Sequence, residues 1–260
     1  MHRFRLGLLF LLLATTQALA AEAPSQLRFC ADNAQWPPFS YSDNNGVMQG
    51  FTIDLLKRVA AQLSIDIQID QLPWKRCLVA TDNGQQYQVA IDASTSPERA
   101  TTYLLSRAYY QLSPYFFYSR RQFTEGIHIT QGHQLGKFGT LCGLAGYNYS
   151  NFALGQTPIY DGAMDFNALT AMTRRGRCAV FIGRYEIVKG MALIGPDLLA
   201  DPDLAYAPIP DAPAEPFYLL ISRNIAEPEA LQQRLNQAIE SMSQSGQLEQ
   251  LRANYQIPLP

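Results

Sequence analysis

The stretch I-D-L-L-K-R-V-A-A-Q-L-S-I-D-I-Q-I, residues 53–69, encodes a helix followed at once by a strand. In its first part the apolar residues recur every three or four places, which gives a helix one apolar face. Ile65, Ile67 and Ile69 then alternate with polar residues, which is the period of a half-buried strand. A short apolar strand at Leu27–Cys30 precedes this pair, and a strand–helix–strand unit predicts an α/β sheet.

The alternation of strands and helices continues in a second series further along the chain. The remaining predicted elements are a helix at 74–81, strands at 88–91, 115–118 and 138–141, a helix at 165–174, strands at 178–182 and 217–221, and helices beginning near 228 and 248. We therefore predict two α/β sheets, with the functional side chains at the ends of their strands.

We predict that the two sheets form two lobes joined by a two-strand hinge. The first lobe comprises residues 21–118 together with 217–260, and the second comprises residues 119–216. The chain then crosses between the lobes near 119 and again near 217. A cleft bordered by such a double crossing can close on a ligand and bury it.

The composition excludes several classes of protein. The chain has 260 residues, 47% of them hydrophobic and 16% charged, with a net charge of −2. That balance provides no basic field for a nucleic acid. Only three histidines are present, and no two of the four cysteines have C-x-x-C spacing, so we predict neither a metal site nor a cofactor.

Residues 1–20 have the features of an export signal. Arg3 and Arg5 precede an apolar segment, Leu6–Ala14, that is too short to span a bilayer. Ala18-Leu19-Ala20 follows as a small-x-small site, so we predict cleavage after Ala20 and a soluble, monomeric mature protein in a bacterial periplasm. The alternative interpretation is a buried first helix.

The periplasm is oxidising, which favours disulfides between paired cysteines. We predict one bridge within each half of the chain, Cys142–Cys178 and Cys30–Cys77. Four buried free thiols are the alternative.

Three groups of motifs occur in order along the chain. They are Asp32 with W-P-P-F at 36–39 and G-F-T-I-D-L-L at 50–56; S-T-S-P-E-R-A at 94–100; and N-x-A-I-x-x-M with S-G-Q-L-x-x-L-x-x-x-Y at 236–255. Together they resemble the extracellular solute-binding proteins of family 3, the periplasmic partners of ABC importers. The resemblance covers Leu27–Tyr255 and implies the two-lobed type II fold of periplasmic binding proteins.

The resemblance implies that Arg99 holds the carboxylate of a ligand. A planar guanidinium can donate two parallel hydrogen bonds to a carboxylate, which lysine cannot do. Ser94 would lie beside that carboxylate, and Asp32 would also face the ligand. In the alternative interpretation Arg99 is a surface residue that caps the next turn or pairs with Glu98.

The two tryptophans, Trp36 and Trp74, fall where the family has cleft aromatics. They could enclose an apolar group or attract a cation through the ring faces, or at least one could fill the core of its lobe. Gly146-Tyr147-Asn148-Tyr149 corresponds to the family's glycine–threonine turn, with Asn148 in place of a ligand-contacting threonine. Tyr147 and Tyr149 could instead be ordinary packing residues at a helix start.

The sequence departs from the family at the position that binds a ligand ammonium. Gly183 stands where the family has an aspartate, and Glu186 could substitute for it only if its loop reaches back. Asp92 replaces a small polar residue and would repel an anionic ligand unless it pairs with Arg99 or an ammonium. The ligand could thus be an unusual amino acid, an amine or another compound.

We predict a protein without enzymatic activity that captures a small polar solute, an amino acid or a related compound, and delivers it to the permease of an ABC importer in the inner membrane. One alternative is an enzyme, because cyclohexadienyl dehydratases resemble these proteins. Its general acid would be Asp92, Asp32 or Glu186. The other alternative is a sensor that docks on a membrane receptor.

Overall fold

The computed structural model describes residues 26–43 and 45–257. The predicted signal peptide and its cleavage site after Ala20 lie outside these residues. In the described part of the chain, no helix combines the length and apolar character needed to cross a membrane.

The first lobe is built on a six-stranded sheet in the order β4-β1-β5-β13-β6, with β7 also paired to β13. Its strands are β1 (Gln26–Asp32), β4 (Asp66–Leu72), β5 (Val89–Ser94), β6 (Tyr103–Leu105), β7 (Tyr110–Leu112) and β13 (Glu215–Ser222). The strands β4, β1 and β5 are parallel, and β13 runs antiparallel to β5. A short hairpin of β2 (Tyr41–Ser42) and β3 (Met48–Gln49) lies apart from this sheet.

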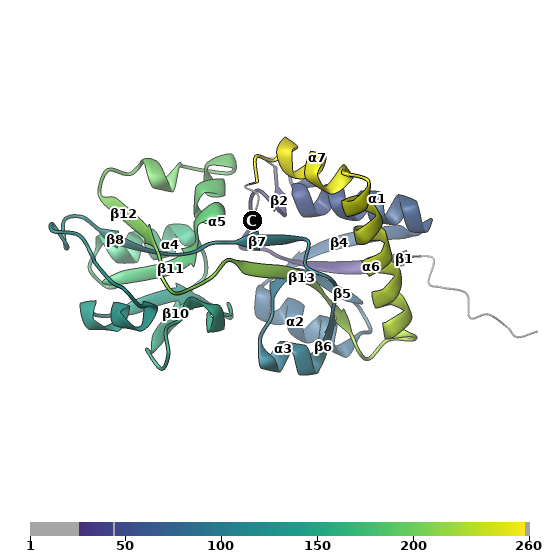
Figure 1. Cartoon of the computed structure of the whole chain (residues 1–260), viewed down its shortest axis with the longest axis horizontal. Helices are drawn as coiled ribbons and strands as arrows, with labels where there is room; N and C mark the ends of the chain where they lie inside the picture. Colours follow the sequence, from purple (N-terminus) through teal and green to yellow (C-terminus); the bar gives the residue numbers. More distant parts are fainter. Residues whose placement is uncertain (1–25, 44, 258–260) are drawn as a thin grey trace, which may run out of the picture.

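Helices cover both faces of this sheet (Figure 1). They are α1 (Phe51–Leu63), α6 (Pro228–Gln244) and α7 (Gln247–Asn254) on one face, and α2 (Trp74–Asn83) and α3 (Pro97–Thr102) on the other. The apolar face of α1 is buried as its spacing predicts, because Leu55, Leu56 and Val59 all pack in the core of this lobe.

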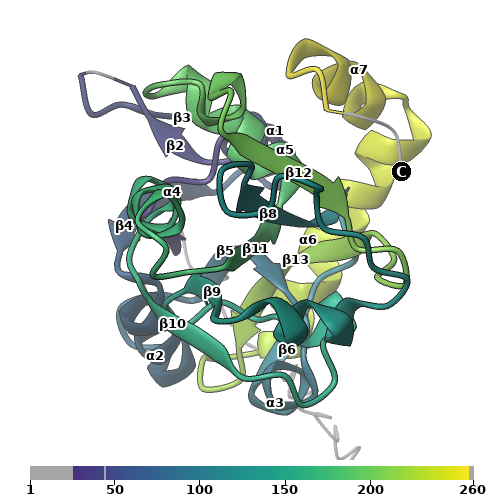
Figure 2. The same cartoon turned by 90° about the vertical axis from the view of Figure 1, so that its left-hand side faces the viewer.

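The second lobe has a five-stranded sheet in the order β10-β9-β11-β8-β12. Its strands are β8 (Pro114–Ser119), β9 (Leu141–Leu144), β10 (Ile159–Ala163), β11 (Val180–Arg184) and β12 (Leu204–Pro208). Figure 2 looks onto this lobe, with α4 (Phe166–Arg174) packed against the sheet and α5 (Tyr185–Gly190) leaving the end of β11. Short 3-10 helices occur at Gly132–Phe138, Ser150–Phe152, Met191–Leu193 and Leu198–Ala200.

Two connections form the hinge, as predicted, but they cross at different residues. The chain passes from β7 to β8 at Ser113 and returns between β12 and β13 at residues 209–214 (Figure 1). Residues 114–118, which we assigned to the first lobe, pair with β11 and β12 in the second sheet. Residues 215–216, which we assigned to the second lobe, belong to the first sheet. An aromatic run predicts a strand but does not determine the sheet to which that strand pairs.

The strand predicted at 138–141 is also corrected. The chain is a 3-10 helix up to Phe138, and β9 begins only at Leu141. Gly139 has a φ of 127°, a conformation that favours glycine, and it turns the chain into the strand.

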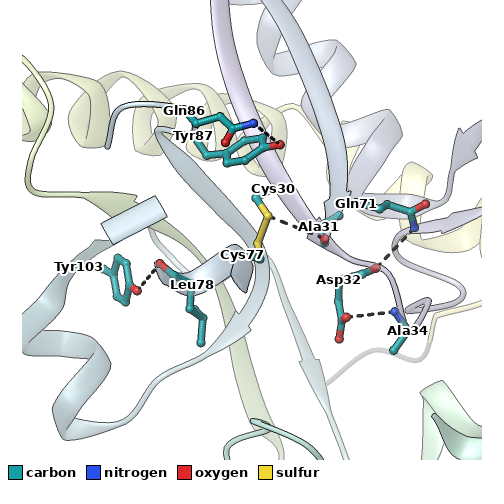
Figure 3. Close-up of a disulfide and its surroundings, with 10 residues drawn as sticks. All are labelled: Cys30, Ala31, Asp32, Ala34, Gln71, Cys77, Leu78, Gln86, Tyr87 and Tyr103. Atoms are coloured by element: carbon teal, nitrogen blue, oxygen red, sulfur yellow. Dashed lines mark hydrogen bonds between the residues drawn. A yellow bond between two sulfur atoms is a disulfide. The ribbon is translucent and has the colours of Figure 1, made fainter. Parts of the chain in front are cut away.

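Both predicted disulfides are confirmed. Cys142 lies in β9 and is bonded to Cys178, just before β11. Cys30 lies in β1 and is bonded to Cys77 in α2, so this bridge joins a strand to the helix that packs on it (Figure 3).

Candidate functional site

A small cavity of about 30 Å³ lies between the lobes, where β1 and β5 of the first lobe meet β11 of the second. The ends of strands in open α/β sheets are the usual place for ligand groups. The residues that line it are Asp32, Trp36, Ser40, Trp74, Ile91, Asp92, Ser94, Arg99, Tyr147, Asn148, Arg184 and Phe217. Every predicted ligand residue except Glu186 is among them.

Arg99 is positioned by the start of α3. Ser96 caps this helix by accepting a hydrogen bond from the Arg99 backbone N–H at 3.2 Å, and Pro97 occupies its first turn. The Arg99 side chain then turns back to donate from Nη1 to the Ser94 carbonyl at 2.9 Å and to Ser94 Oγ at 3.4 Å. It is 8% exposed, so the surface interpretation of Arg99 is wrong.

The guanidinium of Arg99 has no counter-ion within the described residues. Its Cζ lies 5.5 Å from the centre of the Trp74 ring, but no carboxylate of residues 26–43 or 45–257, that of Glu98 included, forms an ion pair with it. Burial, and secondarily the charge of Arg184, lower the pKa of Arg99 to about 10. Arg99 is therefore a buried cation in need of an anionic partner.

Asp32, the last residue of β1, is held from both lobes. Its Oδ2 accepts a hydrogen bond from the Tyr147 hydroxyl at 2.6 Å, and its Oδ1 accepts one from the Ala34 N–H at 3.0 Å. Burial nevertheless raises the pKa of Asp32 above its ordinary value, while these bonds oppose the rise.

Asp92, two residues before the end of β5, is surrounded by hydroxyl groups. It accepts hydrogen bonds from Ser40 at 2.5 Å, Thr52 at 2.6 Å, and Tyr109 and Tyr110, both at 3.0 Å. Burial raises the pKa of Asp92, and the four hydroxyls oppose that rise. We expected Asp92 to need Arg99 or a ligand ammonium as its partner; the hydroxyls of its own lobe take that place.

The two tryptophans line the cavity and also pack in the core of the first lobe. Trp36 donates from Nε1 to the Tyr110 hydroxyl at 3.0 Å, and its ring lies 5.4 Å, edge to face, from that of Tyr147. Trp74 is the first residue of α2 and packs beside Cys30 and Cys77. Each tryptophan is therefore both a cavity residue and a core residue of its lobe, and the two interpretations do not exclude each other.

Asn148 spans the cleft from the second lobe. Its Nδ2 donates to Ser94 Oγ at 3.1 Å and to the Thr95 carbonyl at 2.7 Å. With the bond from Tyr147 to Asp32, these contacts hold the lobes against each other in a closed arrangement.

Arg184, the last residue of β11, was missed by the sequence analysis. It donates from Nε to Glu215 Oε2 at 2.8 Å and from Nη2 to the Asn148 carbonyl at 2.6 Å. Arg184 is 2% exposed and Glu215, at the start of β13, is 1% exposed, so this is a buried ion pair beside the hinge. A charged residue that ends the apolar strand V-F-I-G-R was the available signal.

Glu186 does not belong to the cavity, and its prediction as a ligand residue is wrong. It lies in the first turn of α5, where its carboxylate accepts hydrogen bonds from the Ser113 N–H at 2.9 Å and the Ser113 hydroxyl at 2.7 Å. Gly183 faces the core of the second lobe, because a Cβ there would lie 3.1 Å from the Phe166 ring and 3.7 Å from that of Phe117. Neither residue provides an acid to the cavity.

Within residues 26–43 and 45–257, no group of three or more histidine, cysteine, aspartate or glutamate side chains is arranged to hold a metal ion.

The two-lobed fold and its interlobe cavity are those of a solute-binding protein. Residues 27–257 match the bacterial extracellular solute-binding proteins, family 3, and the chain belongs to that family.

Relatives of this family share the fold at low sequence identity. The chain is 21% identical over 244 residues to a probable histidine-binding protein of Neisseria gonorrhoeae, covering 92% of this chain and 86% of the relative. A histidine-bound substrate-binding protein of a Streptococcus pneumoniae ABC uptake transporter superimposes with a TM-score of 0.71 at 15% identity, covering 89% of this chain and 92% of that one. An ancestral amino-acid-binding protein, a precursor of cyclohexadienyl dehydratase, superimposes with a TM-score of 0.66 at 18% identity, covering 89% and 95% of the two chains.

Proposed function

We propose that this protein captures an amino acid or a related small carboxylate in the interlobe cavity and delivers it to the permease of an ABC importer. The observation that carries the proposal is Arg99, a buried guanidinium that faces the interlobe cavity with no counter-ion among the described residues. A ligand carboxylate would supply the missing charge through paired hydrogen bonds. The relatives that bind amino acids support the same class of ligand.

Hinge closure is the proposed mechanism of capture. Both lobes contribute side chains to the cavity, Arg99 and Asp32 from the first and Tyr147 and Asn148 from the second. A ligand that contacts both lobes binds the closed state more tightly than the open one, and this difference shifts the population toward closure. We propose that the mature protein acts as a monomer in the periplasm after cleavage behind Ala20.

The test is Arg99→Lys, assayed by calorimetric titration with the amino acid or carboxylate that gives the largest thermal shift to the parent protein. The charge stays but the paired geometry is lost, so the binding free energy should weaken by roughly 1.5–3 kcal/mol. Arg28→Lys, at the half-buried ion pair with Asp70 in the same lobe and away from the cavity, is the matched control and should retain the parent affinity. Equal affinity of Arg99→Lys and the parent protein contradicts the proposal.

We further propose that the chain is a binding protein and not a dehydratase. Of the three candidate acids, Glu186 is engaged at the hinge, and Asp32 and Asp92 are occupied by donors of the protein itself. Incubation of the protein with prephenate should therefore yield no product; turnover that Asp32→Asn abolishes overturns this part of the proposal. A sensor with the same binding site would differ only in its partner, and capture of the cognate permease by the ligand-bound protein distinguishes the two.

A further inference from the structure

Around the cavity the cation Arg99 has no counter-ion in the described part of the chain, whereas the acids Asp32 and Asp92 receive hydrogen bonds from the protein. This difference narrows the class of ligand further. Resting on the proposed function, we infer that the solute is a small carboxylate whose remaining groups carry no positive charge, such as a 2-hydroxy or 2-oxo acid, and that a ligand ammonium is not recognised.

The anionic end of the ligand has a prepared partner. Arg99 donates from Nη1 to Ser94, while its Nε and Nη2 donate to no acceptor among the described residues. A guanidinium has five N–H donors in a fixed fork, and the free N–H groups on Nε and Nη2 match the two oxygens of a carboxylate.

Each acid at the cavity already has donors from the protein. The Asp32 carboxylate receives the Tyr147 hydroxyl and the Ala34 N–H, and Asp92 receives four hydroxyls. Glu215 does not line the cavity; it receives Arg184 on Oε2 and the Asn151 amide on Oε1 at 3.1 Å. A carboxylate offers about four lone-pair sites, so these bonds leave none on Asp92 and about two on Asp32, fewer than the three donors of an ammonium.

The second lobe presents a cation to the cavity instead of an acid. Arg184 lines the cavity at the end of β11, whereas Gly183 faces the core and Glu186 faces the hinge. The charge of Arg184 reaches Arg99 and, after burial, helps to lower its pKa, while the charge of Glu215 opposes that effect. Glu215 offsets the charge of Arg184, so an ammonium in the cavity would chiefly meet the unpaired like charge of Arg99, in a site where burial strengthens the repulsion.

The aromatic walls do not provide a cation site either, because both already contact a guanidinium. Arg99 Cζ lies 5.5 Å from the Trp74 ring centre, and Arg184 Cζ lies 6.0 Å from that of Trp36. These distances are within the range of cation–π contacts. The rings, with Ile91 and Phe217, thus leave an apolar lining that suits an uncharged part of the ligand.

The experiment compares ligands that differ only in the ammonium. The full-length mature protein is titrated calorimetrically with the amino acids and with their 2-hydroxy acid counterparts, each pair sharing one side chain. The amino acid amides, which keep the ammonium and lose the carboxylate, form a third set. We expect a hydroxy acid to bind at least about tenfold more tightly than its amino acid, as for one charged group left unpaired, and the amides not to bind.

The outcomes separate this inference from the proposed function. An amino acid that binds as tightly as its hydroxy acid, or more tightly, overturns the inference and leaves the proposed function standing. An amide that binds as well as either carboxylate overturns both, because the carboxylate is then not recognised. If no carboxylate of either set binds, both are again overturned.

Discussion

The Tyr147 hydroxyl of the second lobe donates to the Asp32 carboxylate of the first at 2.6 Å, across the cleft that separates the two sheets. Both side chains line the cavity, and burial raises the pKa of Tyr147 well above its ordinary value, so the phenol remains a proton donor. The bond joins the lobes directly. Closure of the cleft is therefore stabilised by the protein's own side chains as well as by a ligand.

Tyr147→Phe should weaken ligand binding by opening the cleft. The variant leaves Asp32 without its cross-lobe donor, and an unsatisfied buried acceptor costs about 1–3 kcal/mol. Because the bond exists only in the closed state, we expect this cost to appear as lower ligand affinity and as a larger radius of gyration in small-angle X-ray scattering.

Tyr160→Phe is the matched control for this variant, because Tyr160 lies in the same lobe with 53% of its surface exposed. It should match the parent protein in both measurements. An unchanged affinity of Tyr147→Phe contradicts the role of the bond in closure.

Local periodicity predicted most of the fold. The helix at Phe51–Leu63 and the strand after it follow from apolar spacing, which depends only on which face of an element is buried. The predicted hinge lay a few residues from the observed one. The sheet to which β8 belongs is determined by its pairing with β11 and β12, which are far from it in the sequence. No local pattern in residues 114–119 carries that information.

The site was predicted in part for a similar reason. Motifs identified Arg99 and Asp32, whose places follow from strand ends within one lobe. Arg184 could not be predicted as a buried cavity residue because its partner, Glu215, lies 31 positions away on the returning hinge strand. The direction of the Glu186 side chain is set by where α5 begins, and element boundaries are the least predictable feature of a sequence.

Asp92 should make the stability of the protein depend on pH. Burial raises its pKa above the ordinary 3.8, so the folded protein keeps this proton at pH values where the unfolded chain has lost it. The contribution of this group to stability is therefore full at low pH and is lost as the pH rises from 3.8 through the folded-state pKa. The side chain of Asn at position 92 cannot titrate, so the free energy of unfolding of Asp92→Asn should increase relative to that of the parent protein as the pH rises.

Urea unfolding at intervals between about pH 4 and pH 7 checks this prediction. Asp66→Asn, at an exposed position at the start of β4, is the control and should run parallel to the parent protein. A constant difference between Asp92→Asn and the parent across the range contradicts the prediction.

The Cys30–Cys77 disulfide should support binding as well as stability. It joins β1, which ends at Asp32, to α2, which begins at Trp74, and thus connects the elements that place two cavity residues (Figure 3). Loop entropy predicts that replacing either disulfide by two alanines costs roughly 4 kcal/mol of stability. We expect Cys30→Ala/Cys77→Ala also to lower ligand affinity.

The matched control is Cys142→Ala/Cys178→Ala, which opens a loop of similar length in the other lobe. Thermal unfolding and calorimetric titration of both double variants measure the two effects separately. Equal affinities for the two double variants would show that the first bridge stabilises the lobe without positioning its cavity residues.

Removing one partner of the buried pair Arg184–Glu215 should lower stability strongly, whereas replacing both by apolar residues should lower it less. Removing one partner leaves the other charge buried, so Glu215→Gln should lower the free energy of unfolding by about 3–5 kcal/mol. The double variant Arg184→Met/Glu215→Leu removes both charges and should be more stable than Glu215→Gln, whereas Arg174→Met, at the half-exposed pair with Asp201, should cost about 0–1 kcal/mol. Urea unfolding of the four proteins, parent included, gives these values. If the double variant is no more stable than Glu215→Gln, the two residues do not act as a pair.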